Sequence, residues 1–562
     1  MRLFLILFLL PSLAWTFSFS SPPLPPPCGL GFDFGTSGVR LTVLEATDAR
    51  ARVYEASTPW SHPAAVQDVK EWRRALFGLL EEIPVKVRRR VARIAVSGTS
   101  ASCLVVNRAT GAGTRPARLY NWDALHEAPA GIGEKAQALI SEYAPAKHTT
   151  LSGTSTLMKV VSWQLEEAFH PEEIMLHQAD YLAGCLMHDF SQPSSSSSTS
   201  FPSSSSSLYT FPRISDWNNM LKLGYDMSSL SYPSWFSPLL NHRLHLGGIP
   251  SSSSAFSSSS FTNVLPLRVV EPGHIMGPLS YSLLRSLAFP PYCSVVGGTT
   301  DSIAAFLASG LTEPGQAVTS LGSTLAIKMV SRRAVEDSGR GVYSHRLGGK
   351  GGEGGERGAR WLVGGASNVG CAVLREEGFS DGELRRLSAE MDVRERGRDG
   401  SGGSRDSSRK NSGKSSSRII IISSSSSSSS NNNSCTNLNY YPLAGQAGER
   451  FPVCDPNKQK ILTPRPPRRA DFLQGILEGI ARVEKEGYNV LSELGADDLV
   501  EVRTAGGGAK NDVWTRMRGR ILGVPTAKAK ETEAAYGAAL LALKTLLPPY
   551  TPPTLLGERF EG

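Results

Sequence analysis

One short pattern occurs twice in this chain and limits the folds that the chain can adopt. In each copy an apolar, strand-like run enters a turn of Gly, Ser and Thr and leaves as a second apolar run. The copies are "LGFDFGTSGVRLTVLEA" (30–46) and "QAVTSLGSTLAIKMV" (316–330). Alternating apolar residues predict a β-hairpin in each. Two such hairpins about half a chain apart suggest two duplicated domains that clamp a nucleotide, with chance similarity as the alternative.

The first turn, formed by Gly35, Thr36, Ser37 and Gly38, has two interpretations. Glycines in hairpin turns commonly serve the turn geometry alone. Small residues also let backbone N–H groups approach an anion, and Thr and Ser hydroxyls add hydrogen bonds. Asp33, a carboxylate at the strand end, is placed to hold a metal ion through water. The stretch therefore predicts either a structural turn or a phosphate loop.

A third element favours nucleotide binding. "LVEVRTAGGGAKNDVWTRMRGRILGVPT" (499–526) predicts a strand, a glycine turn and an amphipathic helix. Gly506, Gly507 and Gly508 permit a flat ligand to approach the backbone closely. No G-K-[ST] follows these glycines, so we expect an adenine slot here and not a Walker phosphate cradle.

Bulk properties agree with a soluble globular protein of more than one domain. A chain of 562 residues exceeds what one hydrophobic core usually supports. The net charge of +8 is mild for this size, and no basic stripe with interleaved aromatics indicates nucleic-acid binding. The seven cysteines form no C-x-x-C pair, which argues against a disulfide framework or a zinc site and favours a reducing compartment.

Several segments are expected to lie outside the folded domains. Low-complexity sequence of this kind buries too little apolar area to offset chain ordering, so we interpret it as loop insertions. The glycine tract 348–358 belongs with them. Its formal G-x-G-x-x-G at Gly349, Gly351 and Gly354 precedes no helix pattern, so we predict no dinucleotide site there. The Ser- and Asn-rich insertions are 191–207, 251–260 and about 395–435.

The N-terminus has the pattern of a targeting segment. Residues 1–15 combine one Arg, an apolar run and small residues, as a secretory signal peptide does. The apolar run is too short to span a membrane. Residues 16–28 are rich in Ser and Pro and lack acidic residues, which is typical of a transit peptide behind a signal. We expect delivery to a plastid (chloroplast), with simple secretion as the alternative.

Taken together, the motifs resemble the FGGY carbohydrate kinases of the actin-like, ribonuclease-H-like ATPase superfamily. They are most similar to the plant and cyanobacterial D-ribulose kinase branch, often labelled xylulose kinase-like. One departure is that Lys159 and Trp163 are four residues apart, where the family usually has three. The stretches that carry the resemblance are "FDFGTSGVR", "SGTSAS", "RPARLYNWDA", "SDWNNMLKLGYD", "VVGGTTDSIAAFLASG", "TSLGSTLAIK", "LVGGASNVG", "GILEGI" and "AGGGAKNDVW".

The resemblance implies an α/β fold of two actin-like domains with a catalytic cleft between them. The N-terminal kinase domain is expected over 29–273 and the C-terminal domain over 274–549. Phosphoryl transfer needs positioning and charge stabilisation more than covalent work by the protein. The attacking sugar hydroxyl must also lose its proton, so a carboxylate should face it.

Asp301, in "GGTTDSIAAF" (297–306), follows a predicted strand at the start of a helix. A helix N-cap is the common structural reason for such an aspartate. The resemblance instead implies that Asp301 is the catalytic base. It also implies that Asp33 faces metal and phosphate, and that Thr36 lies beside the transferred phosphate.

The other site residues are implied by position. Arg40 offers a fork of donors suited to hydroxyls or phosphate, with a solvated arginine at the strand end as the alternative. Ser97 ends a predicted strand where relatives vary with their sugar. The implied sugar-binding set is Asp33, Ser37, Gly38, Val39, Arg40, Ser97 and Asp301. The implied ATP-binding set is Thr36, Gly322, Ser323, Thr324, Gly506, Gly507, Gly508 and Asn511.

The function implied by the resemblance is conversion of D-ribulose to D-ribulose 5-phosphate with ATP and Mg²⁺. A small sugar and ATP are the expected partners, with no nucleic acid and no membrane in the mature form. D-Xylulose, which differs at one stereocentre, is the alternative substrate. A non-catalytic sugar or nucleotide sensor is the alternative of another class. Intact Asp33, Thr36 and Asp301 favour the enzyme, because a sensor needs no base beside the hydroxyl.

Overall fold

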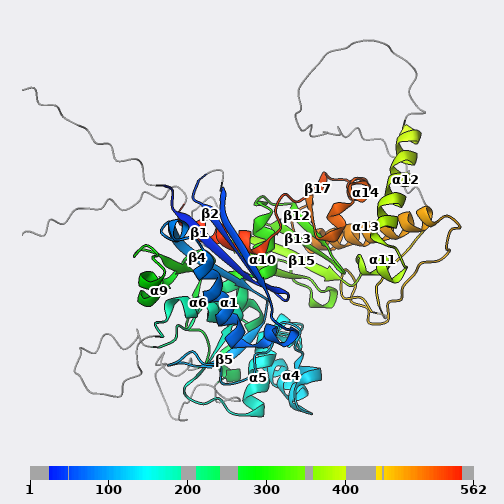
Figure 1. The fold of residues 1–562 in the computed structure, drawn as a ribbon. Helices are drawn as coiled ribbons and strands as arrows, with labels where there is room; N and C mark the ends of the chain where they lie inside the picture. The colour runs from blue at the N-terminus through cyan, green and yellow to red at the C-terminus, as the bar shows by residue number, and fades with distance from the viewer. Residues whose placement is uncertain are drawn as a thin grey trace, which may run out of the picture.

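The computed structural model describes residues 25–47, 50–190, 210–240, 264–348, 358–399, 438–445 and 448–546. Figure 1 shows two β-sheets, each with its own helices. The predicted signal, residues 16–24 of the transit-like extension, both Ser-rich insertions and the G-x-G-x-x-G of the glycine tract lie outside the described residues. The last residue of the predicted extension, Cys28, begins β1 (Cys28–Phe34) and so belongs to the first sheet. The predicted insertion at about 395–435 begins inside helix α12, which runs to Asp399.

The first sheet has the order β3-β2-β1-β4-β10-β9, and β11 also pairs with β4. Strands β1 and β2 form the predicted hairpin, and β1 runs parallel to β4. All seven residues of β1 are buried, because helices cover one face of the sheet and α15 covers the other. The strands are β1 (Cys28–Phe34), β2 (Gly38–Glu45), β3 (Arg52–Pro59), β4 (Val91–Gly98), β9 (Ile275–Pro278), β10 (Ser294–Val296) and β11 (Thr299–Thr300).

The second sheet has the order β14-β15-β13-β12-β16-β17. Its central part repeats the first sheet: three antiparallel strands, then two parallel ones, so that β15-β13-β12-β16-β17 corresponds to β3-β2-β1-β4-β10. The second hairpin, predicted from the sequence, is therefore present in the corresponding place. The strands are β12 (Gln316–Leu321), β13 (Leu325–Ser331), β14 (Tyr343–Gly348), β15 (Arg360–Ser367), β16 (Glu501–Ala505) and β17 (Thr526–Lys528).

The helices complete two cores. Helices α1 and α6 pack together beside the first sheet, whereas α12, α13 and α14 pack with the second (Figure 1). A smaller region carries α4, α5 and the short sheets β5–β6 and β7–β8. The helices are α1 (Val69–Glu82), α2 (Val85–Arg88), α3 (Ala124–Glu127), α4 (Ile132–Tyr143), α5 (Thr156–Glu166), α6 (Gln178–Met187), α7 (Trp217–Met220), α8 (Phe236–Pro238), α9 (Tyr281–Ser286), α10 (Asp301–Ala308), α11 (Ala372–Glu376), α12 (Asp381–Asp399), α13 (Arg469–Glu493), α14 (Asp512–Leu522) and α15 (Ala534–Leu543). The short strands are β5 (Cys103–Asn107), β6 (Glu173–His177), β7 (Ile214–Asp216) and β8 (Arg268–Val270).

The chain crosses between the two sheets more than once. Strands β9, β10 and β11 follow the predicted domain boundary at 273/274, yet they hydrogen-bond within the first sheet or to β4. Helix α15, from the far end of the described chain, packs on β1, β2, β4 and α10. The division at 273/274 stays a prediction, but these segments join the first sheet and not the second.

Helix α15 lies unusually close to β1 because the facing residues are small. A Cβ atom added at Gly31 would come within 2.1 Å of the Ala539 nitrogen, and one at Gly29 within 2.9 Å of Leu543. The crossing of α15 and α10 is as tight, since a Cβ at Gly537 would lie 1.8 Å from the Ala304 carbonyl oxygen. These glycines allow the strand and both helices to meet backbone to backbone.

A buried charge pair ties α14 to the second sheet. Arg518 on α14 donates from Nε to Glu484 of α13 at 2.7 Å and from Nη1 to Thr504 of β16 at 2.6 Å. Both charged side chains are about 1% exposed or less. Thr319 of β12 donates to the same Glu484 carboxylate at 2.5 Å. This network fixes α14 and the turn before it relative to β12.

Within the described part of the chain, every helix is too short or too polar to span a membrane. The cysteines described there are free thiols, and four of the six are buried.

The seam between β1 and α15 gives a first prediction. We expect Gly31→Ala to lower the free energy of unfolding by about 1–3 kcal/mol, because forcing extra atoms into a packed seam is destabilising. Gly78→Ala in α1 is the matched control, since nothing lies within 4 Å of its added Cβ. Alanine in a helix interior should there stabilise by about 0.5–1 kcal/mol. Denaturant melts of both variants test this, and an unchanged Gly31→Ala midpoint would contradict the seam.

Candidate active site

Three neighbouring strand ends bring the first carboxylate and its partners together. Asp33 ends β1 beside Ser97 of β4, and Thr299 of β11 lies on the other side of Ser97. Ser97 Oγ donates to Asp33 Oδ1 at 3.0 Å. Burial and, to a smaller extent, the charge of Asp301 raise the pKa of Asp33 to about 6. The hydrogen bond from Ser97 and the Arg40 guanidinium act in the opposite direction.

Asp301 is the first residue of α10, directly after β11, as the sequence predicts. Thr300 occupies the N-cap position, so Asp301 lies within the helix and is not its cap. The Ser302 N–H donates to Asp301 Oδ1 at 2.6 Å. Burial raises the pKa of Asp301, while that hydrogen bond and the charges of Lys328 and Lys222 oppose the increase. The protonation of the Asp301 carboxylate therefore depends on this hydrogen bond and on the two lysine charges.

The charges of two lysines from different parts of the chain act on Asp301. Lys328 is on β13, and its Nζ is buried with no hydrogen-bond partner among the described residues. Burial lowers the pKa of Lys328 to about 8, although Asp301 supports its charge. Lys222, just after α7, also has a lowered pKa from burial, partly offset by Asp301. One carboxylate therefore interacts with two ammonium groups in a region of low solvent access.

The first turn has the form that its sequence predicts. The Gly35 N–H donates to the Gly38 carbonyl at 3.0 Å, and the Trp60 indole donates to the Gly35 carbonyl at 3.0 Å. Thr36 and Ser37 are exposed. Gly38 has φ +151°, and a Cβ there would lie 2.4 Å from the Thr58 carbonyl oxygen. Gly38 is therefore required by the turn, whereas a Cβ at Gly35 would make only ordinary van der Waals contacts, the nearest at 3.7 Å.

Neighbouring residues of the implied sugar-binding set are less accessible. The Val39 side chain is fully buried in the core, so only its backbone could contact a ligand. Ser97 is also buried and bonds to Asp33. Arg40 is exposed, and its guanidinium lies 3.8 Å from Asp33 and 3.7 Å from Glu533. The geometry leaves Arg40 available to a ligand and gives Ser97 a positioning contact.

The second turn and the glycine turn adjoin one another. Gly322, Ser323 and Thr324 join β12 to β13, and the Arg375 guanidinium donates to Ser323 Oγ at 3.1 Å. Strand β16, which runs into the glycine turn, is parallel to β12. Gly506 has φ +80°, and a Cβ at that position would lie 2.7 Å from the Leu321 carbonyl oxygen. The two turns therefore lie side by side at the same end of neighbouring strands in the second sheet.

The remaining residues of the glycine turn differ in how accessible they are to a ligand. A Cβ at Gly508 would meet Leu321 at 2.6 Å, whereas a Cβ at Gly507 would meet nothing within 4 Å. The Asn511 side chain caps α14 by accepting from the Trp514 N–H at 3.1 Å, and it donates to Ser388 of α12 at 2.9 Å. Gly507 is therefore open to a ligand, and the amide of Asn511 already has two protein partners.

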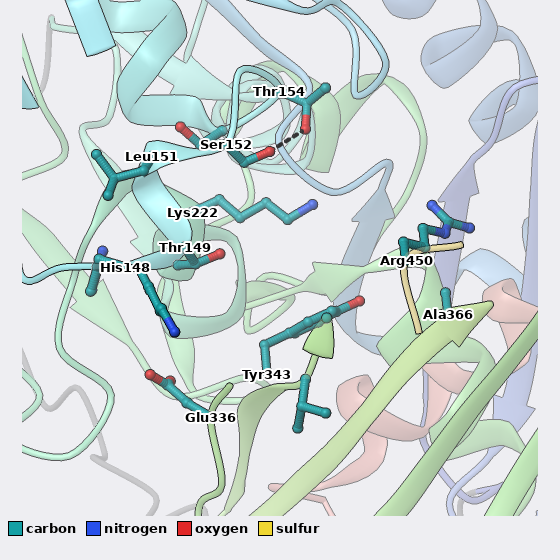
Figure 2. A pocket seen from close by; sticks show the side chains of 14 residues that line it. His148, Thr149, Leu151, Ser152, Thr154, Lys222, Glu336, Tyr343, Ala366 and Arg450 are labelled. Atoms are coloured by element: carbon teal, nitrogen blue, oxygen red, sulfur yellow. Dashed lines mark hydrogen bonds between the residues drawn. The ribbon is translucent and has the colours of Figure 1, made fainter. Parts of the chain in front are cut away.

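A cavity of about 490 Å³ lies between the segment 147–155 with Lys222 on one side and β14, Ala366 and Arg450 on the other. Figure 2 shows Lys222 extending from one wall into the opening, with Arg450 and Tyr343 on the opposite side. Lys222 links this cavity to Asp301, because its charge acts on that carboxylate.

Sequence reasoning did not single out Lys222, Lys328, Tyr343 or Arg450. A signal for Lys328 exists: it is a lone charge in the apolar strand "LAIKMV". Lys222 lies similarly within "MLKLG". Lysine is rarely buried without a functional or structural reason. Tyr343 and Arg450 gave no comparable signal, because both belong to loops or strand ends whose approach depends on the tertiary fold.

Carboxylates that could take part in metal binding are few. Among the described residues no group of three or more His, Cys, Asp or Glu side chains has the arrangement of a metal site. Mg²⁺ in phosphoryl-transfer enzymes usually takes one or two carboxylates, together with water and substrate phosphates. Asp33, with Asp301 close enough to shift its pKa, fits that donor set.

Comparison with known proteins identifies both the fold and one of its domains. Residues 404–546 match the C-terminal domain of the FGGY family of carbohydrate kinases. The structure is similar to a xyloylose kinase from Brucella ovis, with TM-score 0.63 and 19% identity, covering 92% of this chain and 90% of that one. It is also similar to a gluconate kinase from Lactobacillus acidophilus, with TM-score 0.62 and 13% identity over 93% and 90%.

A third similar structure is Plasmodium falciparum glycerol kinase with ADP, with TM-score 0.62 and 14% identity, covering 92% of this chain and 89% of that one. At these identities the three likenesses concern the fold, and they confirm the predicted α/β architecture of two actin-like domains. The chain therefore carries an FGGY-type C-terminal domain in residues 404–546 and shares its overall fold with solved carbohydrate kinases.

Proposed function

We propose that the protein transfers the γ-phosphoryl group of ATP to a ketopentose, D-ribulose, to give D-ribulose 5-phosphate. The observation that carries this proposal is that Asp33 of β1 and Asp301, directly after β11, are both brought beside β4, because β1 and β11 each pair with that strand at Ser97. Kinases of this kind need a carboxylate base and a second acidic group near the phosphates.

Asp301 serves as the general base in this proposal. A base works best when its pKa lies near the operating pH, and burial moves the pKa of Asp301 upward from that of an ordinary aspartate. Lys328 and Lys222 keep the carboxylate ionised before the reaction. As the sugar hydroxyl attacks phosphorus, its proton passes to Asp301, and the bond from phosphorus to the leaving oxygen of ADP breaks.

The two turns hold the phosphates in this proposal. Backbone N–H groups and hydroxyls of small turn residues suit phosphate oxygens. Thr36, exposed on the first turn, lies beside the transferred group, and Ser323 and Thr324 on the second turn face the β- and γ-phosphates. Asp33 helps to hold Mg²⁺, which neutralises charge on the phosphates when it is bound. The open position at Gly507 accepts the adenosine end.

A coupled ADP-release assay on the mature chain across a panel of ketoses tests the substrate. We expect the highest kcat/KM for D-ribulose. A higher value for D-xylulose would correct the sugar and leave the kinase chemistry in place. No ADP release with any sugar would favour a non-catalytic sensor.

The role of Asp301 gives the second prediction. We expect Asp301→Asn to reduce kcat by about 10²–10⁴-fold, the usual contribution of a general base. Nucleotide affinity should change little, because Asp301 is proposed to face the sugar. Single-turnover kinetics with D-ribulose and titration with an ATP analogue measure the two effects. Near-normal turnover of the Asn variant would show that another group is the base.

Lys328 gives the third prediction, on pH dependence. Removing its charge in Lys328→Met should raise the pKa of Asp301, so the acid limb of kcat/KM should move to higher pH. Below pH 8 the wild-type lysine is charged, because its pKa is about 8, so the difference should be largest there. Unfolding should not become easier, because the substitution removes a buried charge without a partner among the described residues.

The control for this experiment is Lys70→Met. Lys70 lies in α1, is exposed, and is distant in the chain from the carboxylates. Its pH profile should coincide with that of the wild type. If Lys328→Met merely lowers the melting temperature and leaves the acid limb in place, Lys328 has a structural role.

The first turn gives the fourth prediction, through two glycines with different surroundings. A Cβ at Gly35 lies 3.7 Å from the nearest atom, whereas one at Gly38 clashes with Thr58. We expect Gly35→Val to retain the wild-type melting temperature and lose ATP-dependent turnover, because its side chain occupies the proposed phosphate position. Gly38→Ala should instead lower the melting temperature. Loss of stability in both variants without a separate effect on kcat would make the turn purely structural.

Thr36→Val complements the glycine pair. It keeps the shape of the exposed side chain and removes one hydroxyl, so kcat should fall more than sugar affinity does. An unchanged kcat would remove Thr36 from the phosphate contacts.

A further inference from the structure

The phosphoryl transfer proposed above makes no use of the cavity of about 490 Å³. Neither turn nor the glycine turn contributes to its lining. Its volume falls within the roughly 300–1,000 Å³ of sites that take drug-sized ligands. A five-carbon sugar at Asp301 would leave much of that space to something else.

Its walls carry an excess of positive charge. Lys147, Lys222 and Arg450 line the cavity, and Glu336 is the only carboxylate in its lining. Burial lowers the pKa of His148, so this fourth basic side chain is neutral at physiological pH. The cavity therefore has three cations against one anion.

Two of the cations lie on opposite walls of the cavity. Lys222 comes from the segment after α7, and Arg450 from the loop before α13 (Figure 2). Burial lowers the pKa of Lys222, Asp301 partly offsets that effect, and the charge of Arg450 lowers the pKa further. Across the described ranges, neither side chain forms an ion pair or a side-chain hydrogen bond. Like charges left unpaired in a cavity favour an anion between them.

Hydroxyl donors surround the same space. Ser152 and Thr154 lie on the wall of Lys222, and their hydroxyls are 3.1 Å apart. The Tyr343 ring lines the opposite wall, with its hydroxyl end toward Arg450 (Figure 2). Charged donors combined with hydroxyls form the usual recognition set for phosphate and carboxylate oxygens.

We propose that this cavity binds an anionic group, a phosphomonoester or a carboxylate, between Lys222 and Arg450. The anion joins the two walls of the cleft and lies next to the acceptor end, since Lys222 also acts on Asp301. The anion is either a distal group of the acceptor sugar or a separate small phosphate compound. The inference rests on the proposed function only in placing the acceptor at Asp301.

Calorimetric titration with inorganic phosphate tests the anion site directly. A saturating non-hydrolysable ATP analogue is present, so that the phosphate positions of the nucleotide are filled. The wild type should bind phosphate, and Arg450→Gln should bind it about ten- to a hundredfold more weakly, as expected for loss of a charged hydrogen bond. Arg333→Gln is the matched control, because this exposed arginine does not line the cavity. It should match the wild type.

A second titration distinguishes the two sources of the anion. D-Fructose 1-phosphate carries a phosphate at C1, the end opposite the hydroxyl that would face Asp301, and D-fructose lacks this phosphate. If the anion belongs to the acceptor, D-fructose 1-phosphate binds more tightly than D-fructose, competes with D-ribulose, and loses that advantage in Arg450→Gln. If the anion is a separate molecule, inorganic phosphate and D-ribulose bind together without competition.

The inference is overturned if neither phosphate nor D-fructose 1-phosphate distinguishes the wild type from Arg450→Gln. That outcome leaves the proposed function untouched when D-ribulose is still phosphorylated. Conversely, anion binding that depends on Arg450 without turnover of D-ribulose would refute the proposed substrate and support the anion site.

Discussion

The contact between α10 and α15 determines where the catalytic groups lie. Gly537 permits the backbone of α15 to meet that of α10 at Ala304, and Gly29 and Gly31 permit α15 to meet β1. Asp301 begins α10 and Asp33 ends β1. One seam of small residues therefore sets the position of both carboxylates, although neither takes part in the packing. A side chain inserted there would move strand and helix together, because packed interiors yield little.

The buried lysines of the cleft lower the stability of the folded protein. Lys328 Nζ is buried without a hydrogen-bond partner among the described residues, and Lys222 faces Arg450. Burying a charge without a close partner is unfavourable. Such groups cluster at functional sites because they shift the pKa of their neighbours. Here they oppose the effect of burial on Asp301. Substrates that bring negative charge into the cleft would relieve this repulsion.

Local patterns predicted the hairpins well, because a period of two and a Gly-Ser-Thr turn leave few alternatives over 30–46 and 316–330. The placement of Asp301 after a strand and at a helix start was predicted for the same local reason. The resemblance supplied its proposed role, which stays a prediction. The substrate is also undetermined by the fold, since the similar structures include kinases named for different substrates.

Features that depend on contacts between residues far apart in the chain could not be predicted from the sequence. The short strands β9 to β11 join the first sheet across a predicted boundary, and strands of two to four residues carry almost no periodic signal. The burial of Val39 and Ser97 follows from neighbours in the fold. The cavity requires two walls contributed by segments nearly 300 residues apart, such as 147–155 and Arg450. No local sequence pattern predicts that these two segments come together.

The order of the strands also has a consequence for biosynthesis. Strands β1 to β4 leave the ribosome early, but their sheet is completed by β10 and β9, and its second face is covered by α15 at residues 534–543. At about 5–20 residues per second, roughly 25–100 s separate the synthesis of β1 from that of α15. During that interval the apolar face of β1 lacks its final cover. The nascent first half is therefore a natural client for chaperones that shield unpaired strands until the last helix arrives.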